Sequence, residues 1–305
     1  MYLCKVKKKR GLKQAASNYF PEPFVSIANI SSSENPEKAR SRQRSSWRVR
    51  LSTIAALALL LGGCLDSPDH VTATYDVGIW AGTGSSPTSV RATFEAVRAS
   101  GFIYDTLTAA ELIGGTGDVS IYRYKMIIFP DGDQRAYSEY LGGAGRAIIR
   151  DYVAGGGGFI GFGAGGGLAG ADSLTWPGIG IIPATTDYPI SQIATPPVHT
   201  LTDVFRTEDA GDVLGSNAYR SLYTGGPQFF PFTNYRLWVS YRYHVTGGAA
   251  AITALYRNGR VFVTGFQPEY EEGSMRDSTN FADELPDPES EWELIRLAIA
   301  FCVER

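Results

Sequence analysis

The sequence predicts an α/β domain with a mostly parallel sheet and helices on both of its faces. Three observations lead to this prediction. In the first half of the folded region, short apolar segments typical of buried strands alternate with amphipathic helical segments. A helix end, a strand and a sharp glycine turn follow one another within residues 151–170. Near the C-terminus, Asn258-Gly259 separates two strand-like segments and predicts an added β-hairpin.

The first half is expected to supply four buried strands and two long helices. The strands are predicted at residues 74–80, 102–107, 125–129 and 158–162. Ser86 is a good N-cap and Pro87 suits a first helical position, so one helix should begin here. Its buried stripe is predicted to be Val90, Phe94 and Val97. A second helix is expected over residues 144–154.

The second half has a different pattern, with β-segments joined by loops rich in Gly, Pro and aromatic residues. Strands are expected at residues 179–185, 219–223 and 237–243, followed by the hairpin of 251–256 and 260–264. A last helix should be capped by Asp287 and opened by Pro288. Its predicted buried stripe is Trp292, Ile295, Ile299 and Cys302. Because no linker interrupts the pattern, residues 72–305 are interpreted as one domain.

Charge divides the chain into a basic head and an acidic remainder. Residues 1–63 hold 12 of the 28 Lys and Arg residues and 3 of the 31 Asp and Glu residues. Residues 64–305 therefore carry 16 basic and 28 acidic residues, a net charge of −12. Such an acidic surface argues against a nucleic-acid partner for the folded part.

The basic head has the organisation of an export signal. Arg48 and Arg50 precede the uninterrupted apolar run Leu51–Leu61, which at about 11 residues is too short to span a bilayer. Leu61-Gly62-Gly63-Cys64 follows and resembles the lipobox of bacterial lipoproteins, whose cysteine is acylated. The alternative is a core helix followed by an incidental cysteine. We expect residues 48–63 to be a lipoprotein signal peptide, with lipidation at Cys64.

The segments on either side of this signal lack the periodicity of a fold. Residues 1–47 are basic and Ser-rich, and are interpreted as a disordered extension or as the product of a wrongly assigned upstream start. Residues 64–71 are a short polar tether. The expected location is therefore the bacterial cell envelope, lipid-anchored on the extracytoplasmic side. Leu65 rather than Asp follows the cysteine, which leaves sorting to the outer membrane open.

The glycine turn at residues 163–166 has the pattern of a nucleophile elbow, in which a tight strand-to-helix turn holds one residue at positive φ. An elbow normally presents Ser or Cys at its tip, but here the tip position is Gly163. The same stretch also satisfies G-x-G-x-x-G after a strand. As a dinucleotide fingerprint this is weak, because it lies on the fourth strand and Asp187 lies too far along the chain for the acidic partner.

Several ordered stretches together resemble one family. They are VGIWAGTGSSPTSVRATFEAVRASG, MIIFPDGDQRAYSEYLGGAGRAIIRDYVAGGGGFIGFGAGG, Gly225-Gly226-Pro227 and GRVFVTGFQPEYEE. They are similar to the N-terminal domain of biotin-protein ligases of the fungal and eukaryotic type, which also occurs alone in bacteria. The resemblance covers about residues 75–275 and implies a class I glutamine amidotransferase-like domain with a flavodoxin-like, three-layer sandwich. Nothing resembles the ATP loop of the biotin-ligating domain, so biotin ligase activity is not implied.

The resemblance also implies where a catalytic triad would lie. It assigns the nucleophile to Gly163, the base to Gln267 and the orienting acid to Glu269. Glycine cannot attack a carbonyl, and an amide has no useful basicity near neutral pH. The Ala164 N–H and the loop at Gly132 would supply oxyanion donors, whereas a carboxylate at Asp131 would repel an oxyanion.

These residues lead to a hypothesis about function. The strand ends expected to border a crevice contribute the ligand-binding candidates Gly82, Gly84, Ser85, Asp131, Gly132, Asp133, Ala164, Gln267 and Glu269. For Gly82–Ser86, a capped turn is the alternative to a binding loop. We expect a degenerate domain that binds a small polar ligand or an envelope protein, without a metal or cofactor. The alternative is a hydrolase or amidase that uses other crevice residues, such as Asp133, Glu269 or a tyrosine of the aromatic-rich stretch 219–243.

Overall fold

The computed structural model describes residues 73–116, 119–171, 176–208, 215–232, 237–287 and 289–304. Ser67–Arg305 forms one compact unit. The predicted signal segment and Cys64 lie outside the described residues. Within the described ranges, no helix combines the length and the apolar character needed to cross a membrane.

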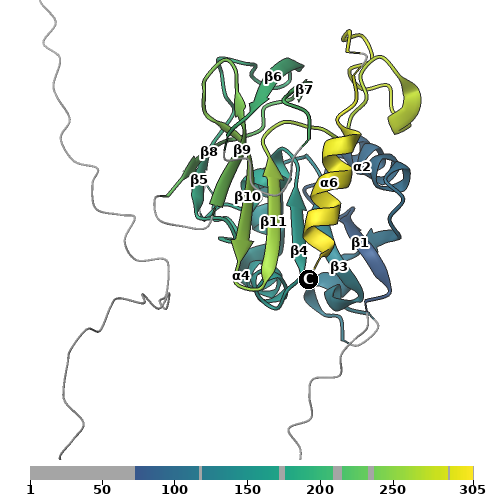
Figure 1. Ribbon diagram of the computed structural model, residues 1–305. Coiled ribbons are helices and arrows are strands. Elements are labelled where there is room, and N and C mark those ends of the chain that lie inside the picture. The colour runs from purple at the N-terminus through teal and green to yellow at the C-terminus, as the bar shows by residue number, and fades with distance from the viewer. Residues whose placement is uncertain are drawn as a thin grey trace, which may run out of the picture. The chain divides into compact units, whose positions relative to one another are not determined.

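The N-terminal strands and the last strand form the parallel half of an 11-stranded sheet (Figure 1). These strands are β1 (Tyr75–Trp80), β2 (Tyr104–Leu107), β3 (Tyr124–Phe129), β4 (Gly158–Gly161) and β11 (Gly259–Thr264). Their order is β2-β1-β3-β4-β11, and every neighbouring pair is parallel. The first strand lies inside the sheet with the second outside it, which is the flavodoxin-like order that the resemblance implied.

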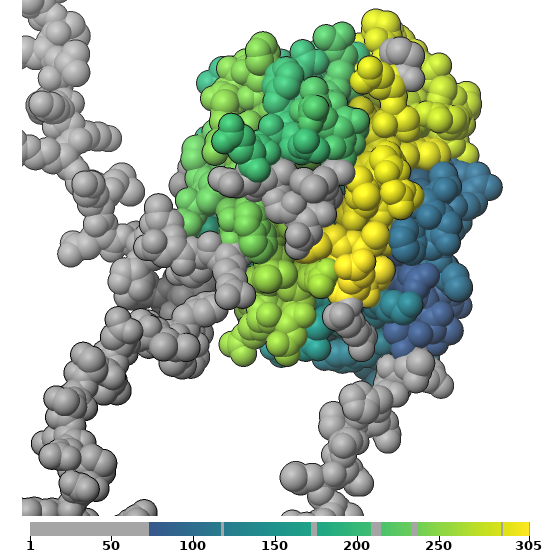
Figure 2. Space-filling model, viewed as in Figure 1, coloured from purple at the N-terminus to yellow at the C-terminus, as the bar shows by residue number. Residues whose placement is uncertain are grey.

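Helices cover both faces of this parallel half. On one face lie α2 (Pro87–Ala99) and α6 (Trp292–Val303); on the other lie α3 (Ala109–Ile113), α4 (Gln134–Ala154) and α5 (Ala164–Leu168) (Figure 1). Two short 3₁₀ helices, Ile121–Arg123 and Met275–Asp277, lie in connections. In Figure 2 the C-terminal segment, in yellow, lies at the surface between the blue N-terminal part and the green antiparallel strands.

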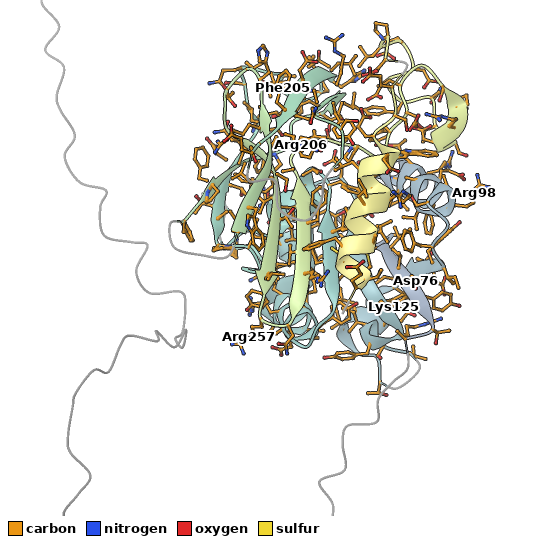
Figure 3. The ribbon with its side chains drawn as sticks, viewed as in Figure 1. Asp76, Arg98, Lys125, Phe205, Arg206 and Arg257 are labelled. Carbon is orange, nitrogen blue, oxygen red and sulfur yellow. The ribbon has the colours of Figure 1, made fainter. Side chains whose placement is uncertain are left out.

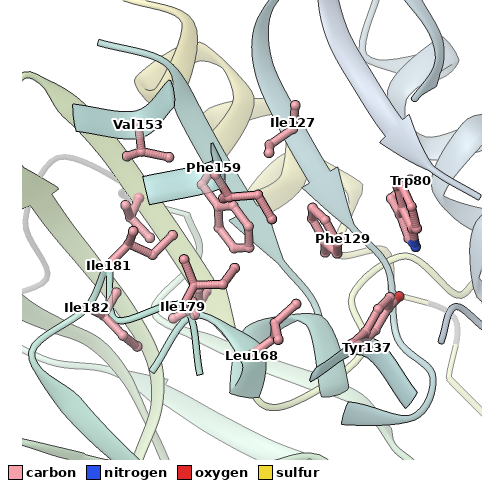
Figure 4. Packing of buried hydrophobic residues seen from close by; sticks show 14 of the residues in the cluster. Trp80, Ile127, Phe129, Tyr137, Val153, Phe159, Leu168, Ile179, Ile181 and Ile182 are labelled. Carbon is pink, nitrogen blue, oxygen red and sulfur yellow. The ribbon is translucent and has the colours of Figure 1, made fainter. Parts of the chain in front are cut away.

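Alternating side chains of the parallel strands build two separate cores. Met126, Ile128 and Phe262 pack toward α2 and α6, whereas their neighbours Ile127 and Phe129 pack on the opposite face. Figure 4 shows this second core, in which the rings of Trp80 and Phe129 are stacked with their centroids 5.6 Å apart. Because the inner part of the sheet is covered on both sides, β3 and β4 are apolar at nearly every position, whereas the edge strand β2 is half polar.

An antiparallel extension completes the sheet, and it is larger than the hairpin that the sequence predicted. β10 (Ala249–Tyr256) pairs with β11 and continues through β9 (Leu237–Tyr243) and β6 (Thr200–Arg206) to β7 (Ala218–Tyr223). β5 (Ala184–Asp187) and β8 (Gln228–Pro231) branch from β10. Of the strand predicted at residues 179–185, only the last two residues are part of a strand, β5. The sequence did not predict β6 and β8, because their segments are polar or very short and lack clear alternation. Tyr256 pairs with Gly259, so Arg257 and Asn258 form the hairpin turn, one residue earlier than predicted.

Helix boundaries differ from the sequence prediction at two places. α4 begins at Gln134, capped by the Asp133 side chain, and the predicted helix is its second part, after a kink at Gly142 with φ 56°. α6 begins at Trp292, with Glu291 at the N-cap, so Asp287 does not cap it. The Asp287 carboxylate instead accepts the Glu289 N–H at 2.9 Å, which closes a turn before the helix.

The buried face of α2 is more polar than its apolar stripe predicted. Val97 is buried, but Val90 and Phe94 are half-buried, and the buried face is completed by Ser89, Ala92, Thr93 and Ala96. Ser86 occupies the N-cap position, but its hydroxyl pairs with Thr88 at 2.8 Å and makes no capping bond.

An ion pair joins adjacent strands at the end of the sheet where β1 and β3 begin. Asp76 of β1 and Lys125 of β3 form it at 2.7 Å (Figure 3).

Candidate functional site

A cleft of about 580 Å³ opens where β1, β3 and β4 end, on the carboxyl side of the parallel strands. This is the position at which open α/β sheets bind ligands. We call it the cleft throughout. Its lining residues come from the loops after β1 and β3, the first turns of α2, α4 and α5, and the β7–β8 turn. The connections from β5 to β6 and from β11 to α6 supply the rest. They are Gly84–Ser86, Thr88, Asp131–Asp133, Ala136, Ala164, Tyr188, Pro196, Pro197, Thr224–Pro227, Tyr270 and Phe281.

Backbone contacts join the first two of these loops. The Ser86 N–H donates to the Asp131 carbonyl, and the Asp133 N–H donates to the Gly84 carbonyl, both at 2.8 Å. A Cβ at Gly132 would lie 2.0 Å from the Gly84 carbonyl oxygen, so this approach requires glycine. Five of the predicted ligand-binding candidates are thereby brought to one edge of the cleft: Gly84, Ser85, Asp131, Gly132 and Asp133.

Two polar candidates at this edge have structural partners already. The Ser85 hydroxyl donates to the Gly82 carbonyl at 2.7 Å and closes the β1–α2 turn. The Asp133 carboxylate accepts the Arg135 and Ala136 N–H groups at 2.8 and 3.1 Å and caps α4. Gly82 packs against the Trp80 indole and does not line the cleft. The Gly82–Ser86 loop is therefore closed by the Ser85 hydroxyl, but the Ser86 side chain does not cap α2, and Gly84–Ser86 line the cleft.

The elbow has the predicted geometry but no room for a side chain. Gly163 lies between β4 and α5 with φ 49° and ψ −113°, a conformation that favours glycine. A Cβ at this position would lie 2.1 Å from Oδ1 of Asp131 and 2.5 Å from Nε2 of Gln267. Both distances are far below van der Waals contact, so the space of a nucleophile is filled by two neighbouring side chains.

Asp131 is the central side chain of the site. Its Oδ1 accepts the Ala164 N–H at 2.7 Å, and its Oδ2 accepts the Thr224 hydroxyl at 2.8 Å. Burial raises the pKa of this carboxyl, and the two hydrogen bonds oppose that shift. The resemblance implied that Asp131 would repel an oxyanion held by Ala164. In the structure the aspartate itself takes the Ala164 donor, so the donor is engaged within the chain.

Gln267 and Glu269 lie fully buried beneath the cleft and do not line it. Oε1 of Gln267 accepts the Thr224 N–H at 3.1 Å, and its Nε2 lies beside Asp131 without a hydrogen bond of normal geometry. Oε1 of Glu269 accepts the Ser89 hydroxyl at 2.6 Å. Burial and the nearby charge of Asp131 raise the pKa of Glu269 well above its ordinary range. Glu269 therefore supports α2 rather than orienting a base.

Ser89 and Thr224 were missed by the sequence reasoning. The Ser89 hydroxyl donates to Glu269 and accepts the Asp131 N–H at 2.8 Å, which ties α2 to the strand ends. Thr224 holds both Asp131 and Gln267. Ser89 could have been recognised as a polar residue one position before Val90, the first residue of the apolar stripe predicted for α2. Thr224 directly precedes the Gly225-Gly226-Pro227 segment that the resemblance singled out, but no local pattern marks its role.

The arrangement lacks the groups of amidotransferase chemistry. At the three positions that the resemblance assigns, no thiol or hydroxyl stands at the elbow and no imidazole stands beside it. No group of three or more His, Cys, Asp or Glu side chains in the described ranges is arranged to hold a metal ion. The outer glycines of the G-x-G-x-x-G pattern have a packing role: a Cβ at Gly161 would lie 2.4 Å from the Gly165 carbonyl oxygen, and a Cβ at Gly166 would lie 2.3 Å from the Thr264 carbonyl oxygen.

Comparisons with known proteins agree with this fold. Residues 75–175 match the family described as "Biotin-protein ligase, N terminal". PurLQS from Thermotoga maritima superimposes with a TM-score of 0.50 at 13% identity, covering 75% of this chain and 99% of that one. A glutamine amidotransferase gives 0.47 at 17% identity, covering 63% of this chain and 90% of that one. Curated protein sequences give no significant match. The resemblance inferred from the sequence is thus confirmed, and likeness at these identities concerns the fold alone.

Proposed function

We propose that this protein is a lipid-anchored envelope protein that binds a small polar ligand in the cleft. The proposal starts from the amidotransferase-like fold and from the match of residues 75–175 to the biotin-protein ligase N-terminal family. The proposal treats the domain as a binding module rather than an enzyme. It places the domain on the extracytoplasmic side of a bacterial membrane, attached through Cys64. An envelope protein that inserts a polar group into the cleft is a second form of the same idea.

The observation that carries the proposal is the contact between Asp131 and Gly163. A carboxylate that fills the nucleophile position, 2.1 Å from where a Cβ would stand, removes the reaction centre. The cleft of about 580 Å³ in front of it nevertheless has the size range of small-molecule sites. A retained cleft without its reactive groups supports binding without turnover.

The location rests on the sequence signal. Arg48, Arg50, the apolar run Leu51–Leu61 and Cys64 occur in the order of a lipoprotein signal. The net charge of −12 over residues 64–305 suits a domain that is not drawn toward nucleic acid.

Ligand binding can be tested with a variant that fills the cleft. Ala136 lines the cleft on the first turn of α4, and Ala144 lies exposed on the same helix. The purified full chain would be screened against a small-molecule library by thermal shift and the hits measured by calorimetry. We expect Ala136→Trp to abolish binding of the hits and Ala144→Trp to leave it unchanged. Hits that bind both variants equally would place the ligand elsewhere.

The alternative, a hydrolase or amidase that uses other crevice residues, can be tested with the same protein. The screen would follow hydrolysis of glutamine, of amides and of esters. Glu269 is the fully buried one among the groups named for such an activity. Turnover by the wild type that is lost in Glu269→Gln, while that variant remains folded, would replace the binding proposal with the enzyme. We expect no turnover in either protein.

A further inference from the structure

We infer that the cleft takes an organic cation, an ammonium group carried on a compact apolar body. This inference rests on the proposed function and adds to it the chemical class of the ligand. It is argued from the charge of the cleft, from the anchoring of Asp131 and from the aromatic wall.

The charge of the cleft has one sign. Asp131 and Asp133 line it, and among the lining residues that the structure describes there is no Lys, Arg or His. The His199 imidazole is not among the lining residues, but its ring packs against that of Phe281 with the centroids 5.0 Å apart, and its Nε2 lies 2.6 Å from Oε1 of Glu284. An anionic ligand would therefore meet two carboxylates and no compensating cation, which would cost more free energy than binding could return. A cationic ligand would meet the complementary charge.

The backbone donors that attract anions in related geometries are already used. The Ala164 N–H at the start of α5 donates to the Asp131 carboxylate at 2.7 Å. The Ser86 N–H at the start of α2 donates to the Asp131 carbonyl at 2.8 Å. Helix N-termini with free N–H groups are ready anion sites. An anion that used either of these two N–H groups would have to break an internal hydrogen bond.

Asp131 is anchored in a way that leaves acceptor capacity for a ligand. Each carboxylate oxygen has two lone pairs; Oδ1 of Asp131 accepts the Ala164 N–H and Oδ2 accepts the Thr224 hydroxyl, and the Gly132 N–H and the Gln267 amide also interact with this carboxylate. Its orientation is thus fixed before a ligand arrives. A bound ammonium could donate to either oxygen in a charge-assisted hydrogen bond, which is about twice as strong as a neutral one. A fixed carboxylate loses little conformational entropy when it forms such a bond.

Three aromatic residues also line the cleft, Tyr188, Tyr270 and Phe281, of which Tyr270 is itself buried. The rings of Tyr270 and Phe281 have centroids 5.1 Å apart at 46°, and both residues line the cleft. The Tyr270 hydroxyl lies 3.1 Å from the Thr88 hydroxyl, which holds the ring in place. Tyr188 adds a third ring. Aromatic faces attract cations and also bury apolar surface, so they fit an ammonium group on an apolar body better than a metal ion or a sugar.

The test uses three probes that share one shape and differ in charge: 2-phenylethylamine, 2-phenylethanol and 3-phenylpropionate. Their binding to the full chain would be measured by ligand-observed NMR and calorimetry. We expect the amine to bind at least roughly tenfold more tightly than the alcohol and the propionate not to bind. Asp131→Asn keeps the shape and an acceptor for the Ala164 N–H. It should weaken amine binding by roughly tenfold, whereas Asp151→Asn, at an exposed site on α4, should not change it.

A second variant keeps the inference testable if Asp131→Asn fails to fold. Phe281→Leu removes one ring of the wall and should weaken the amine more than the alcohol. Equal binding of amine and alcohol, preference for the propionate, amine binding unchanged in both variants, or no amine binding at millimolar concentration would each overturn the organic-cation class. If the organic-cation class is overturned but Ala136→Trp still blocks the library hits, the proposed binding function is retained. The two proposals can therefore fail separately.

Discussion

The carboxylate of Asp131 stands where a side chain of residue 163 would have to be. A Cβ on Gly163 would approach Oδ1 of Asp131 to 2.1 Å, and that oxygen already accepts the Ala164 N–H at 2.7 Å. The two positions are therefore mutually dependent: a side chain at 163 requires the aspartate to leave, and the aspartate requires glycine at 163. This relationship separates the domain from a catalytic elbow more completely than the missing nucleophile alone.

The first prediction is that Gly163→Ala destabilises the protein and that removing Asp131 relieves part of the loss. The methyl group adds overpacking, worth about 1–3 kcal/mol, to the cost of a positive φ, worth about 1–2 kcal/mol. In the Asp131→Gly background the overpacking against Oδ1 disappears but the cost of φ remains. Urea unfolding of both single variants and the double variant measures the coupling. Strictly additive losses would contradict the dependence.

A control for this prediction exists in the same chain. Gly143 lies in α4, and a Cβ there would have no atom within 4 Å. Gly143→Ala should leave the free energy of unfolding unchanged or raise it by up to about 1 kcal/mol, since alanine favours a helix more than glycine does. Destabilisation by Gly143→Ala as large as that by Gly163→Ala would show that the effect at 163 is not specific to its neighbours.

The second prediction concerns the hydroxyl of Ser89. It joins the Glu269 carboxyl at 2.6 Å and the Asp131 N–H at 2.8 Å, and both Ser89 and Glu269 are fully buried. Ser89→Ala leaves a buried acceptor and a buried donor without partners, so it should lower the free energy of unfolding by about 1–3 kcal/mol. Ser86→Ala, which removes a hydroxyl that makes no capping bond, should cost less than about 0.5 kcal/mol. Urea unfolding distinguishes the two, and similar losses would contradict this account.

Sequence periodicity predicts the parallel half of the fold well, for a physical reason. β1, β3 and β4 are covered by helices on both faces, so nearly every position must be apolar and the strands stand out in the sequence. β6 and β8 do not stand out. β6 buries only Thr202 and Val204 and ends on exposed Phe205 and Arg206, and β8 is four residues long. Their pairing is decided by neighbours far away in the chain.

The sequence predicts where the site lies but not the hydrogen bonds within it. The elbow and the strand ends follow from local glycine patterns, and the structure brings Asp131, Gly163 and Gln267 together there. The position of the Asp131 carboxylate depends on a hydrogen bond from Thr224, which is 93 positions away in the chain. No local pattern encodes a contact of that separation. Sequence reasoning therefore suggested an empty oxyanion site, whereas in the structure an internal carboxylate occupies it.

The third prediction concerns the membrane anchor. Cys64 follows the pattern of a lipobox and Cys302 is buried in α6, so the two thiols should behave differently toward acylation. Cells that express the full chain in a bacterial host and are fed a clickable fatty acid should label it. Cys64→Ser should remove the label and release the protein from the membrane fraction, and Cys302→Ser should keep both. Labelling that persists in Cys64→Ser would contradict the anchor.

The fourth prediction is that stability falls as pH rises through the range in which Glu272 titrates. Burial, together with the nearby Asp287 and Asp277, raises the pKa of Glu272 to about 7. The folded state therefore keeps a proton that the unfolded state loses near pH 4.5, and the contribution to stability declines between these values by up to about 1.4 kcal/mol per pH unit. Urea unfolding between about pH 5 and 7 should show a shallower pH slope for Glu272→Gln. Glu208→Gln, at an exposed site, should keep the wild-type slope. An unchanged slope in Glu272→Gln would mean that this carboxyl is ionised in the folded protein.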